Sequence, residues 1–211
     1  MIVDAIVLTG GRSSRLDSIA KSDLRFEGRT LLHRTLSAVS RARRTVVVGA
    51  RPDESLVDGV LHTREDPPFG GPAAGIAAGM ACLSLQPGGA SDAVLVVACD
   101  MPHVERAVPP LISALGEHPD ADGVVPVDSG GHRQPLAAVY RTTPFAAAIA
   151  DHERAGSLGG VPVSRLVMGL DLAEITVPAD ATADVDTPDD AVRLGVSFPT
   201  PIHPSPSEGA P

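Results

Sequence analysis

The chain has 211 residues and a net charge of −9, and it is 43% hydrophobic and 20% charged. These values indicate one globular domain, or one domain with a small lobe, and the acidic balance argues against nucleic acid as a partner. The apolar run at the amino terminus is too short for export or for crossing a membrane. We therefore expect a cytoplasmic protein with no membrane contact.

Short apolar runs alternate with amphipathic segments along the chain. We predict strands at residues 5–9, 45–49, 93–98, 123–127, 135–140 and 173–177. We predict helices at residues 30–42, 72–84, 104–117, 144–153, 163–168 and 188–194. This alternation is typical of a three-layer α/β fold, in which a mostly parallel sheet carries helices on both faces. The run at 135–140 follows the strand at 123–127 too closely for a crossover helix, so at least one antiparallel strand is expected.

The end of the chain has a different composition. Residues 197–211 read SFPTPIHPSPSEGAP, which is rich in Pro and Ser and has no hydrophobic period. Such a segment cannot bury enough apolar surface to order itself. We expect one domain over residues 1–196 and a disordered tail over residues 197–211.

The most informative stretch is AIVLTGGRSSR at residues 5–15, with Lys21 six residues further on. Gly10 and Gly11 end an apolar run and leave backbone N–H groups uncovered, so this turn can wrap a phosphate chain. Arg15 and Lys21 can supply the positive charge that a triphosphate needs. The spacing does not match the dinucleotide fingerprint or the P-loop, so a plain strand-to-helix turn with two surface cations stays open.

A carboxylate follows the most hydrophobic predicted strand. The run AVLVVACD ends in Asp100, and ligands of open α/β sheets bind beyond the carboxyl ends of the strands. Mg²⁺ is usually held by one or two carboxylates together with phosphates and waters. Asp100 is therefore the first candidate for a metal ligand, and a cap on the following turn is the alternative.

A second acidic run is ATADVDTPDD at residues 181–190. Asp189 and Asp190 fit the first turn of a helix that begins near Pro188. Asp184 and Asp186 are not explained in this way, because their alternate spacing places them on one side of an extended segment. Asp186 is a candidate second metal ligand, with plain capping as an equal alternative.

The segment REDPPFGGPAAGIAAGM at residues 64–80 combines a rigid loop with a helix start that carries only small residues. Such a stripe lets a flat ligand approach the backbone, and it equally suits tight packing of a helix on a sheet. Asp66 stands just before this loop, and we expect it to contact a ribose hydroxyl or a base.

Taken together, these residues resemble the molybdenum cofactor guanylyltransferases of the MobA-like nucleotidyltransferase family. The matching motifs are LTGGRSSRL with Lys21, GGPAAGI, VACDMP, RQPLAAVY and DVDTPDD, in the order of the family. The resemblance implies a Rossmann-like nucleotidyltransferase fold that binds GTP and Mg²⁺ and transfers GMP to molybdopterin. It also implies transient contact with enzymes that make or receive the cofactor.

The resemblance assigns roles residue by residue. The backbone of Leu8, Thr9, Gly10 and Gly11 would contact the nucleotide, as would Asp66. Lys21 would contact the phosphates, and Asp100 would contact both nucleotide and Mg²⁺. With Arg15, the residues Lys21 and Asp100 form the expected catalytic set, and Asp100 and Asp186 the expected metal ligands.

The chain departs from the family pattern in three places. Asp17 stands where the family usually has Gly, and Ala20 stands where it has Asp. The loop after the second strand reads VVVGARPDE and lacks an Asn that often touches the nucleotide. The motif DVDTPDD also resembles the molybdopterin cytidylyltransferases. Transfer from CTP, or to another small phosphate, and nucleotide binding without catalysis therefore remain alternatives.

Overall fold

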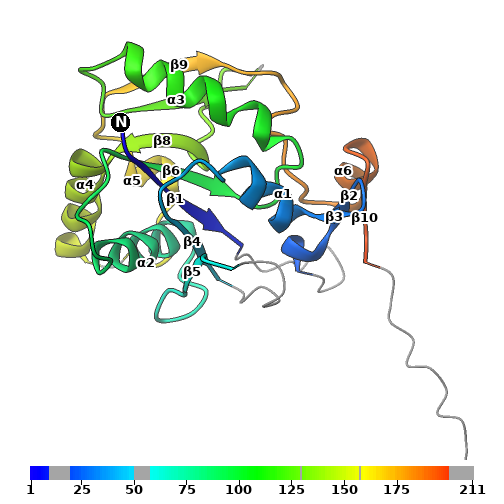
Figure 1. Ribbon diagram of the computed structural model, residues 1–211, viewed down its shortest axis with the longest axis horizontal. Coiled ribbons are helices and arrows are strands. Elements are labelled where there is room, and N and C mark those ends of the chain that lie inside the picture. Colours follow the sequence, from blue (N-terminus) through cyan, green and yellow to red (C-terminus); the bar gives the residue numbers. More distant parts are fainter. Residues whose placement is uncertain (10–19, 50–57, 129, 157, 200–211) are drawn as a thin grey trace, which may run out of the picture.

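A seven-stranded sheet forms the centre of the structure (Figure 1), which is a computed structural model that describes residues 1–9, 20–49, 58–128, 130–156 and 158–199. The strand order is β5-β4-β1-β6-β8-β7-β9. Strand β8 pairs antiparallel with both β6 and β7, and the other neighbours are parallel. The expected antiparallel strand in a mostly parallel sheet is confirmed. The strands are β1 (Val3–Leu8), β4 (Thr45–Val48), β5 (Leu61–Thr63), β6 (Ala93–Ala98), β7 (Gly123–Val127), β8 (Ala137–Arg141) and β9 (Leu172–Thr176).

Helices cover both faces of this sheet, which confirms the predicted three layers. Successive strand residues point to opposite faces, so Ala5 and Val7 face one apolar core while Ile6 and Leu8 face the other. Helices α1 (Leu31–Ala38) and α3 (Val108–Glu117) complete the first core. The second core is completed by α2 (Pro72–Ser84), α4 (Thr142–Ala155) and α5 (Val163–Leu166). A short 3₁₀ turn, η3 (Val104–Arg106), precedes α3.

Helix α2 begins and ends where the sequence predicts, and its small residues have a packing role. Pro72 occupies the first turn after Gly71, whose φ of 88° suits glycine. A Cβ at Gly79 would lie 3.0 Å from the side chain of Ile6, and one at Gly75 would lie 3.3 Å from Leu8. Close approach of α2 to β1 therefore accounts for the glycines of this stripe.

A second sheet of three short strands lies beside the main one, where the label of α6 stands in Figure 1. Its order is β10-β2-β3, and it joins chain segments that are far apart in sequence. Its strands are β2 (Arg25–Phe26), β3 (Arg29–Thr30) and β10 (Val196–Ser197). Two short helices, η1 (Lys21–Asp23) and α6 (Pro188–Arg193), precede β2 and β10 in the chain. A small apolar core holds them together, built from Leu24, Leu31, Val185, Ala191, Leu194 and Val196.

The predicted tail lies mostly outside the described residues. Ser197 still pairs with Arg25 in β10, and Pro199 is the last residue described. Disorder of residues 200–211 stays a prediction. In the part of the chain that the structure describes, no helix has both the length and the apolar character needed to cross a membrane.

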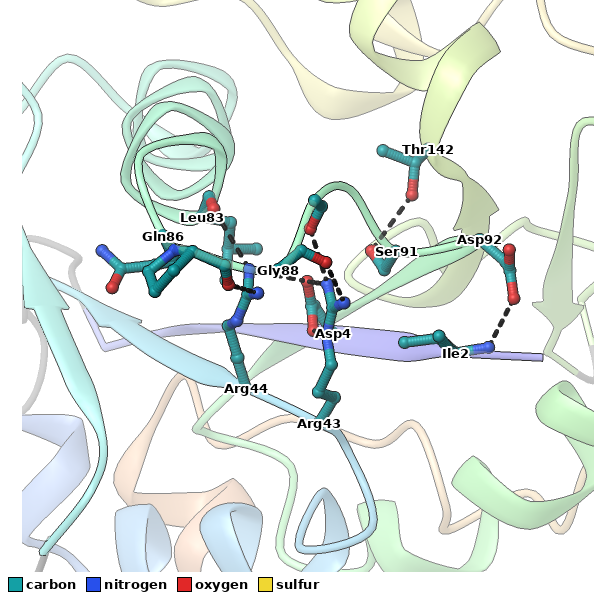
Figure 2. A network of polar contacts seen from close by, with 12 residues as sticks. Ile2, Asp4, Arg43, Arg44, Leu83, Gln86, Gly88, Ser91, Asp92 and Thr142 are labelled. Carbon is teal, nitrogen blue, oxygen red and sulfur yellow. Dashed lines mark hydrogen bonds and ion pairs between the residues drawn. The ribbon is translucent and has the colours of Figure 1, made fainter.

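A buried carboxylate anchors the amino-terminal edge of the main sheet (Figure 2). Asp4 on β1 is 2% exposed and accepts two hydrogen bonds from Arg43, at 3.0 Å from Nε and 2.8 Å from Nη2. The same guanidinium donates to the carbonyl oxygens of Gly88 and Gly89, at 3.2 and 3.1 Å. This bidentate pair ties β1 to the loops before β4 and β6, at the edge opposite the candidate site.

Candidate active site

The carboxyl ends of β1, β4 and β6 meet at one edge of the sheet because these strands are parallel. The N–H of Cys99 donates to the carbonyl oxygen of Leu8 at 3.0 Å, which continues the pairing of β1 and β6 to the residue before Asp100. The carboxylate of Asp100 is 17% exposed. The sheet therefore delivers Asp100 to the edge where α/β folds bind ligands, as predicted.

Lys21 reaches Asp100 from the small sheet. It is the first residue of η1, and its Nζ donates to Asp100 Oδ2 at 2.8 Å and also forms an ion pair with Asp186. Burial lowers the pKa of Lys21, but the carboxylates of Asp100 and Asp186 outweigh it, and the net pKa is raised above the usual value. The ammonium is therefore charged at neutral pH.

Asp184 and Asp186 flank Val185, which is held by its side chain in the small core and by its N–H in a hydrogen bond. Val185 is buried in the small core, and its N–H donates to the backbone carbonyl of Asp100 at 3.0 Å. With Val185 held there, one carboxylate oxygen from each of Asp100, Asp184 and Asp186 lies within 4.8 Å of the others. Loss of surrounding water and the two neighbouring carboxylates raise the pKa of Asp184. We name Asp100, Asp184 and Asp186 the carboxylate cluster.

A capping box fixes the chain directly after the cluster. Asp190 accepts from the N–H and the hydroxyl of Thr187, at 3.0 and 2.7 Å, and Thr187 caps α6. Asp190 also accepts from the N–H of Asp186 at 3.3 Å. Hydrogen bonds from Arg193 and Thr187 lower the pKa of Asp190 to about 2. The capping explanation is confirmed for Asp190, and Asp186 is left with its carboxylate directed to Lys21.

The donor atoms of the carboxylate cluster suit a hard divalent cation. Carboxylate oxygens are the ligands that Mg²⁺ prefers, and Mg²⁺ usually takes only one or two of them beside phosphates and waters. Asp100 and Asp186 supply that number, and Asp184 adds a third carboxylate that the sequence prediction did not include. The residues present therefore fit the expected metal ion.

Leu8 and Thr9 lie where the predicted phosphate loop leaves the sheet. The N–H of Thr9 donates to the carbonyl of Val48 at 2.9 Å, and its hydroxyl donates to the same oxygen at 3.0 Å. The N–H of Thr9 and the carbonyl oxygen of Leu8 therefore already have hydrogen-bond partners on the neighbouring strands. Gly10, Gly11 and Arg15 lie outside the described residues, so their roles stay predictions, as do those of Leu8 and Thr9.

Asp66 lies at the same edge but in a different cleft. It follows β5, which is parallel to β4, and it lines a cleft of about 420 Å³ that α2 and the chain after α4 enclose. Neither Lys21 nor Asp100 is among the described residues of this cleft. The structure therefore brings Lys21, Asp100 and Asp186 together and leaves Asp66 apart from them, so contact of Asp66 with the nucleotide stays a prediction.

A third part of this edge is the loop after β7. Asp128 accepts hydrogen bonds from the N–H groups of Gly130 and His132, at 2.8 and 2.9 Å, and these bonds lower its pKa. His132 is exposed, and Arg133 forms an ion pair with Glu174 at 2.7 Å. The loop thus presents the guanidinium of Arg133, paired with Glu174, and the exposed ring of His132 at the carboxyl end of β7.

A family model described as the MobA-like NTP transferase domain matches residues 5–163. The chain belongs to the MobA-like NTP transferase family. A curated relative from Ectopseudomonas mendocina (strain ymp), named molybdenum cofactor guanylyltransferase, is 32% identical over 189 residues, which is 87% of each chain. A relative from Clostridium perfringens (strain SM101 / Type A), named probable molybdenum cofactor guanylyltransferase, is 28% identical over 137 residues. That second match covers 65% of this chain and 65% of the relative's length.

Solved structures of this NTP transferase class share the fold. Molybdopterin-guanine dinucleotide biosynthesis protein A from Archaeoglobus fulgidus superposes with a TM-score of 0.66 at 21% identity, covering 90% of this chain and 96% of that one. The 2-C-methyl-D-erythritol 4-phosphate cytidylyltransferase from Thermus thermophilus gives the same TM-score at 20% identity, covering 92% and 97%. The predicted nucleotidyltransferase fold is confirmed, and the fold by itself does not choose between guanine and cytosine nucleotides.

One signal in the sequence points to Asp184, the member of the carboxylate cluster that the prediction left out. The family match ends at residue 163, so the segment with Asp184 and Asp186 lies beyond it. The alternate spacing of those two residues already placed both on one side of an extended segment.

Proposed function

We propose that this chain transfers GMP from GTP to the terminal phosphate of molybdopterin, with Mg²⁺, and releases pyrophosphate. The observation that carries the proposal is the contact of the Lys21 ammonium with the carboxylates of Asp100 and Asp186 at the ligand edge of the sheet. A fixed cation beside oxygen ligands for a divalent ion is what a nucleoside triphosphate requires. The names of the relatives from Ectopseudomonas mendocina and Clostridium perfringens support the choice of guanylyl transfer to this cofactor.

The bond changes are those of a single displacement at phosphorus. An oxygen of the acceptor's phosphate monoester attacks the α-phosphorus of GTP, and the bond from that phosphorus to the oxygen leading to the β-phosphate breaks. Pyrophosphate leaves with the electron pair, and GMP is joined to the acceptor through a new phosphoanhydride. The monoester has a second pKa near 6, so the nucleophile is mostly dianionic at neutral pH and no side chain need remove a proton.

The residues of the site then have electrostatic and positioning roles. Lys21 neutralises the departing β- and γ-phosphates, and Arg15 has the same predicted role. Asp100 and Asp186 would hold the metal ion, with Asp184 beside them. The ion supplies charge stabilisation to the phosphate oxygens when it is bound. Arg133, on the loop after β7, lies at the same edge of the sheet and provides positive charge for an anionic acceptor, and His132 beside it offers a ring nitrogen for a hydrogen bond.

Cytidylyl transfer is the second candidate. The motif DVDTPDD resembles that of the molybdopterin cytidylyltransferases, and the solved cytidylyltransferase from Thermus thermophilus has the same fold. A third candidate is nucleotide binding without catalysis, because Asp17 and Ala20 depart from the family pattern beside Lys21.

Binding and turnover separate these three functions. Calorimetry with GTP, CTP, ATP and UTP, each with and without Mg²⁺, is expected to show tight binding of GTP only with Mg²⁺ and weak binding of CTP. Pyrophosphate release with GTP and molybdopterin is the expected activity. Preference for CTP would assign the chain to cytidylyl transfer, and GTP binding without pyrophosphate release from any acceptor would assign it to the binding proteins.

The proposal also covers the compartment in which the reaction takes place and the transfer of its product to another enzyme. The reaction takes place in the cytoplasm, and the product passes to its next enzyme through transient protein contact. A pull-down with enzymes that make or receive the cofactor tests the second part, since a stable complex or the absence of any contact would each contradict it.

A further inference from the structure

The position expected for a divalent cation is held by a side chain of the protein itself. The ammonium of Lys21 lies 2.8 Å from Asp100 Oδ2 and also contacts Asp186 Oδ1. These two residues are the expected metal ligands, and a carboxylate oxygen of Asp184 lies within 4.8 Å of both. An ammonium and a divalent ion cannot share the same carboxylate oxygens without strong mutual repulsion. Either cation must therefore weaken the binding of the other.

The chemistry of Lys21 suits a cation that is bound and then released. Its ammonium is a compact charge on a flexible four-carbon chain, whereas an arginine would form a planar two-pronged contact that is harder to break. Lys21 is the only lysine among the 17 basic side chains counted as lysine or arginine. The side chain is 18% exposed, so its charged end is enclosed by the cluster and still has access to the edge of the sheet.

Without a counter-ion, the cluster would be hard to keep in place. Three carboxylates lie within 4.8 Å of one another, and like charges at this spacing repel each other. The segment from Asp184 to Asp186 is attached to the rest of the site through Val185 and the small core. A cation from η1 thus stabilises the arrangement in the free protein and preserves the positions of the ligands.

We infer that Lys21 is a placeholder for the metal ion: it occupies the carboxylate cluster in the free protein and leaves it for the phosphates when a nucleotide binds. This inference uses one part of the proposed function, namely that the ligand of the site is a nucleoside triphosphate. Its consequence is positive coupling, because the nucleotide removes the cation that competes with the metal ion. Coupling between two ligands is reciprocal, so the metal ion must raise nucleotide affinity by the same factor.

The first test measures metal affinity without nucleotide. Mn²⁺ binding, followed by electron paramagnetic resonance, is expected to be weak in the wild type and about tenfold tighter in Lys21→Met, within the usual range of coupling between sites. Lys21→Arg keeps the charge and is expected to bind Mn²⁺ no more tightly than the wild type. Arg106→Gln is the matched control, because it removes one positive charge that pairs with Asp180 outside the cluster. Equal or weaker Mn²⁺ binding in Lys21→Met would overturn the inference.

The second test measures coupling. A GTP analogue with a methylene group between the α- and β-phosphorus is expected, at saturation, to raise Mn²⁺ affinity about tenfold in the wild type and much less in Lys21→Met. Circular dichroism of each variant checks that it is folded. A nucleotide effect on Mn²⁺ affinity that is the same in both proteins would contradict a placeholder role.

The third test observes Lys21 directly. Because the chain has one lysine, protein labelled with ¹³C-lysine gives one Cε resonance in a nuclear magnetic resonance spectrum. That resonance is expected to move when the GTP analogue binds together with Mg²⁺, and it must stay unchanged in ligand-free Asp151→Asn, which removes an exposed carboxylate outside the site. An unchanged lysine resonance in the complex would contradict the inference.

The inference and the proposed function fail in different ways. If no nucleotide binds, the proposed function fails, while the Mn²⁺ affinities of the free proteins still test the placeholder role. If GTP binds and is turned over but Lys21→Met leaves Mn²⁺ affinity unchanged, the placeholder role fails and the proposed function stands.

Discussion

The N–H of Val185 donates a hydrogen bond to the backbone carbonyl oxygen of Asp100, over 3.0 Å. This bond joins the end of the central strand β6 to a segment that begins more than eighty residues later in the chain. Because the side chain of Val185 is buried in the small core, the aspartates on either side of it are held next to Asp100. The contacts of Val185, together with the hydrogen bond from the N–H of Asp186 to Asp190, thus hold two carboxylates beside Asp100.

Replacing Asp100 with asparagine is expected to abolish most of the activity. The change keeps the shape of the side chain but removes a charge that a metal ion and Lys21 both require, so a loss of about 100-fold in kcat/KM is expected. Pyrophosphate release measures the loss, and circular dichroism checks the fold. Asp180→Asn is the control, since Asp180 is exposed and pairs with Arg106 outside the cluster. Mg²⁺-dependent turnover near the wild-type rate in Asp100→Asn would rule out the metal role.

Lys21→Ala is expected to weaken GTP binding in the presence of Mg²⁺. Loss of a charged hydrogen bond to phosphate costs about 1.5–3 kcal/mol, or roughly 10- to 100-fold in Kd. Calorimetry at saturating Mg²⁺ measures the change, so that competition between Lys21 and the metal ion does not contribute. Unchanged GTP affinity would refute contact between Lys21 and the phosphates.

Gly123 and Gly116 form a matched pair for stability. A Cβ at Gly123 on β7 would lie 2.6 Å from the backbone oxygen of Val139, whereas a Cβ at Gly116 on α3 would meet nothing within 4 Å. Gly123→Ala is expected to destabilise the fold by about 1–3 kcal/mol through overpacking. Gly116→Ala is expected to be neutral or to stabilise it by up to about 1 kcal/mol. Urea unfolding of both variants measures the difference, and equal values would contradict the close pairing of β7 and β8.

The buried carboxylate of Asp4 is expected to matter for stability and not for the chemistry. Asp4→Ala removes the buried acceptor of two hydrogen bonds from Arg43, and loss of hydrogen bonds to a charged group costs about 1.5–3 kcal/mol. Asp151→Ala, which removes an exposed partner of Arg154, is expected to cost less than about 1 kcal/mol. Thermal unfolding distinguishes the two. A loss of catalytic rate without a loss of stability in Asp4→Ala would be incompatible with its place at the far edge of the sheet.

The contribution of Asp190 to the free energy of unfolding is expected to depend on pH. Its pKa is lowered to about 2 by Arg193 and Thr187, so its charged form stabilises the folded state. A carboxyl with a lower pKa in the folded state contributes fully above its unfolded pKa, near 4, and loses the contribution as the pH falls towards 2. The stability difference between wild type and Asp190→Asn is therefore expected to be largest at neutral pH and to narrow below about pH 4. Urea unfolding at several pH values measures it, and a difference that grows in acid would contradict the capping box.

The main sheet could be predicted closely because its signals are local. Strand β6 is apolar throughout and buried on both faces, and α2 starts at a proline, so both have the predicted bounds. The edge strand β5 has three residues, and β2, β3 and β10 have two each, which is too few for a hydrophobic period. These short strands form only because distant segments pair.

The site could be predicted in part for the same reason. Asp100 was expected at the sheet edge because it directly follows a long apolar strand. Lys21 and Asp186 were each selected from a local pattern, but their contact with each other depends on the small sheet, which joins the two ends of the chain. The alternate spacing places Asp184 on the same side as Asp186, but it does not show that this side faces Asp100, and only the contact of Val185 with Asp100 brings Asp184 into the cluster.

The small sheet has a consequence for how the protein matures. Its strand β10 and the segment from Asp184 to Asp186 leave the ribosome after every strand of the main sheet. A nascent chain can thus complete its scaffold while its carboxylates remain separated, and we expect chemical competence only after this later-made segment docks against η1 and β2. A chain interrupted before residue 184 is expected to fold around the central sheet yet to lack two of the three carboxylates.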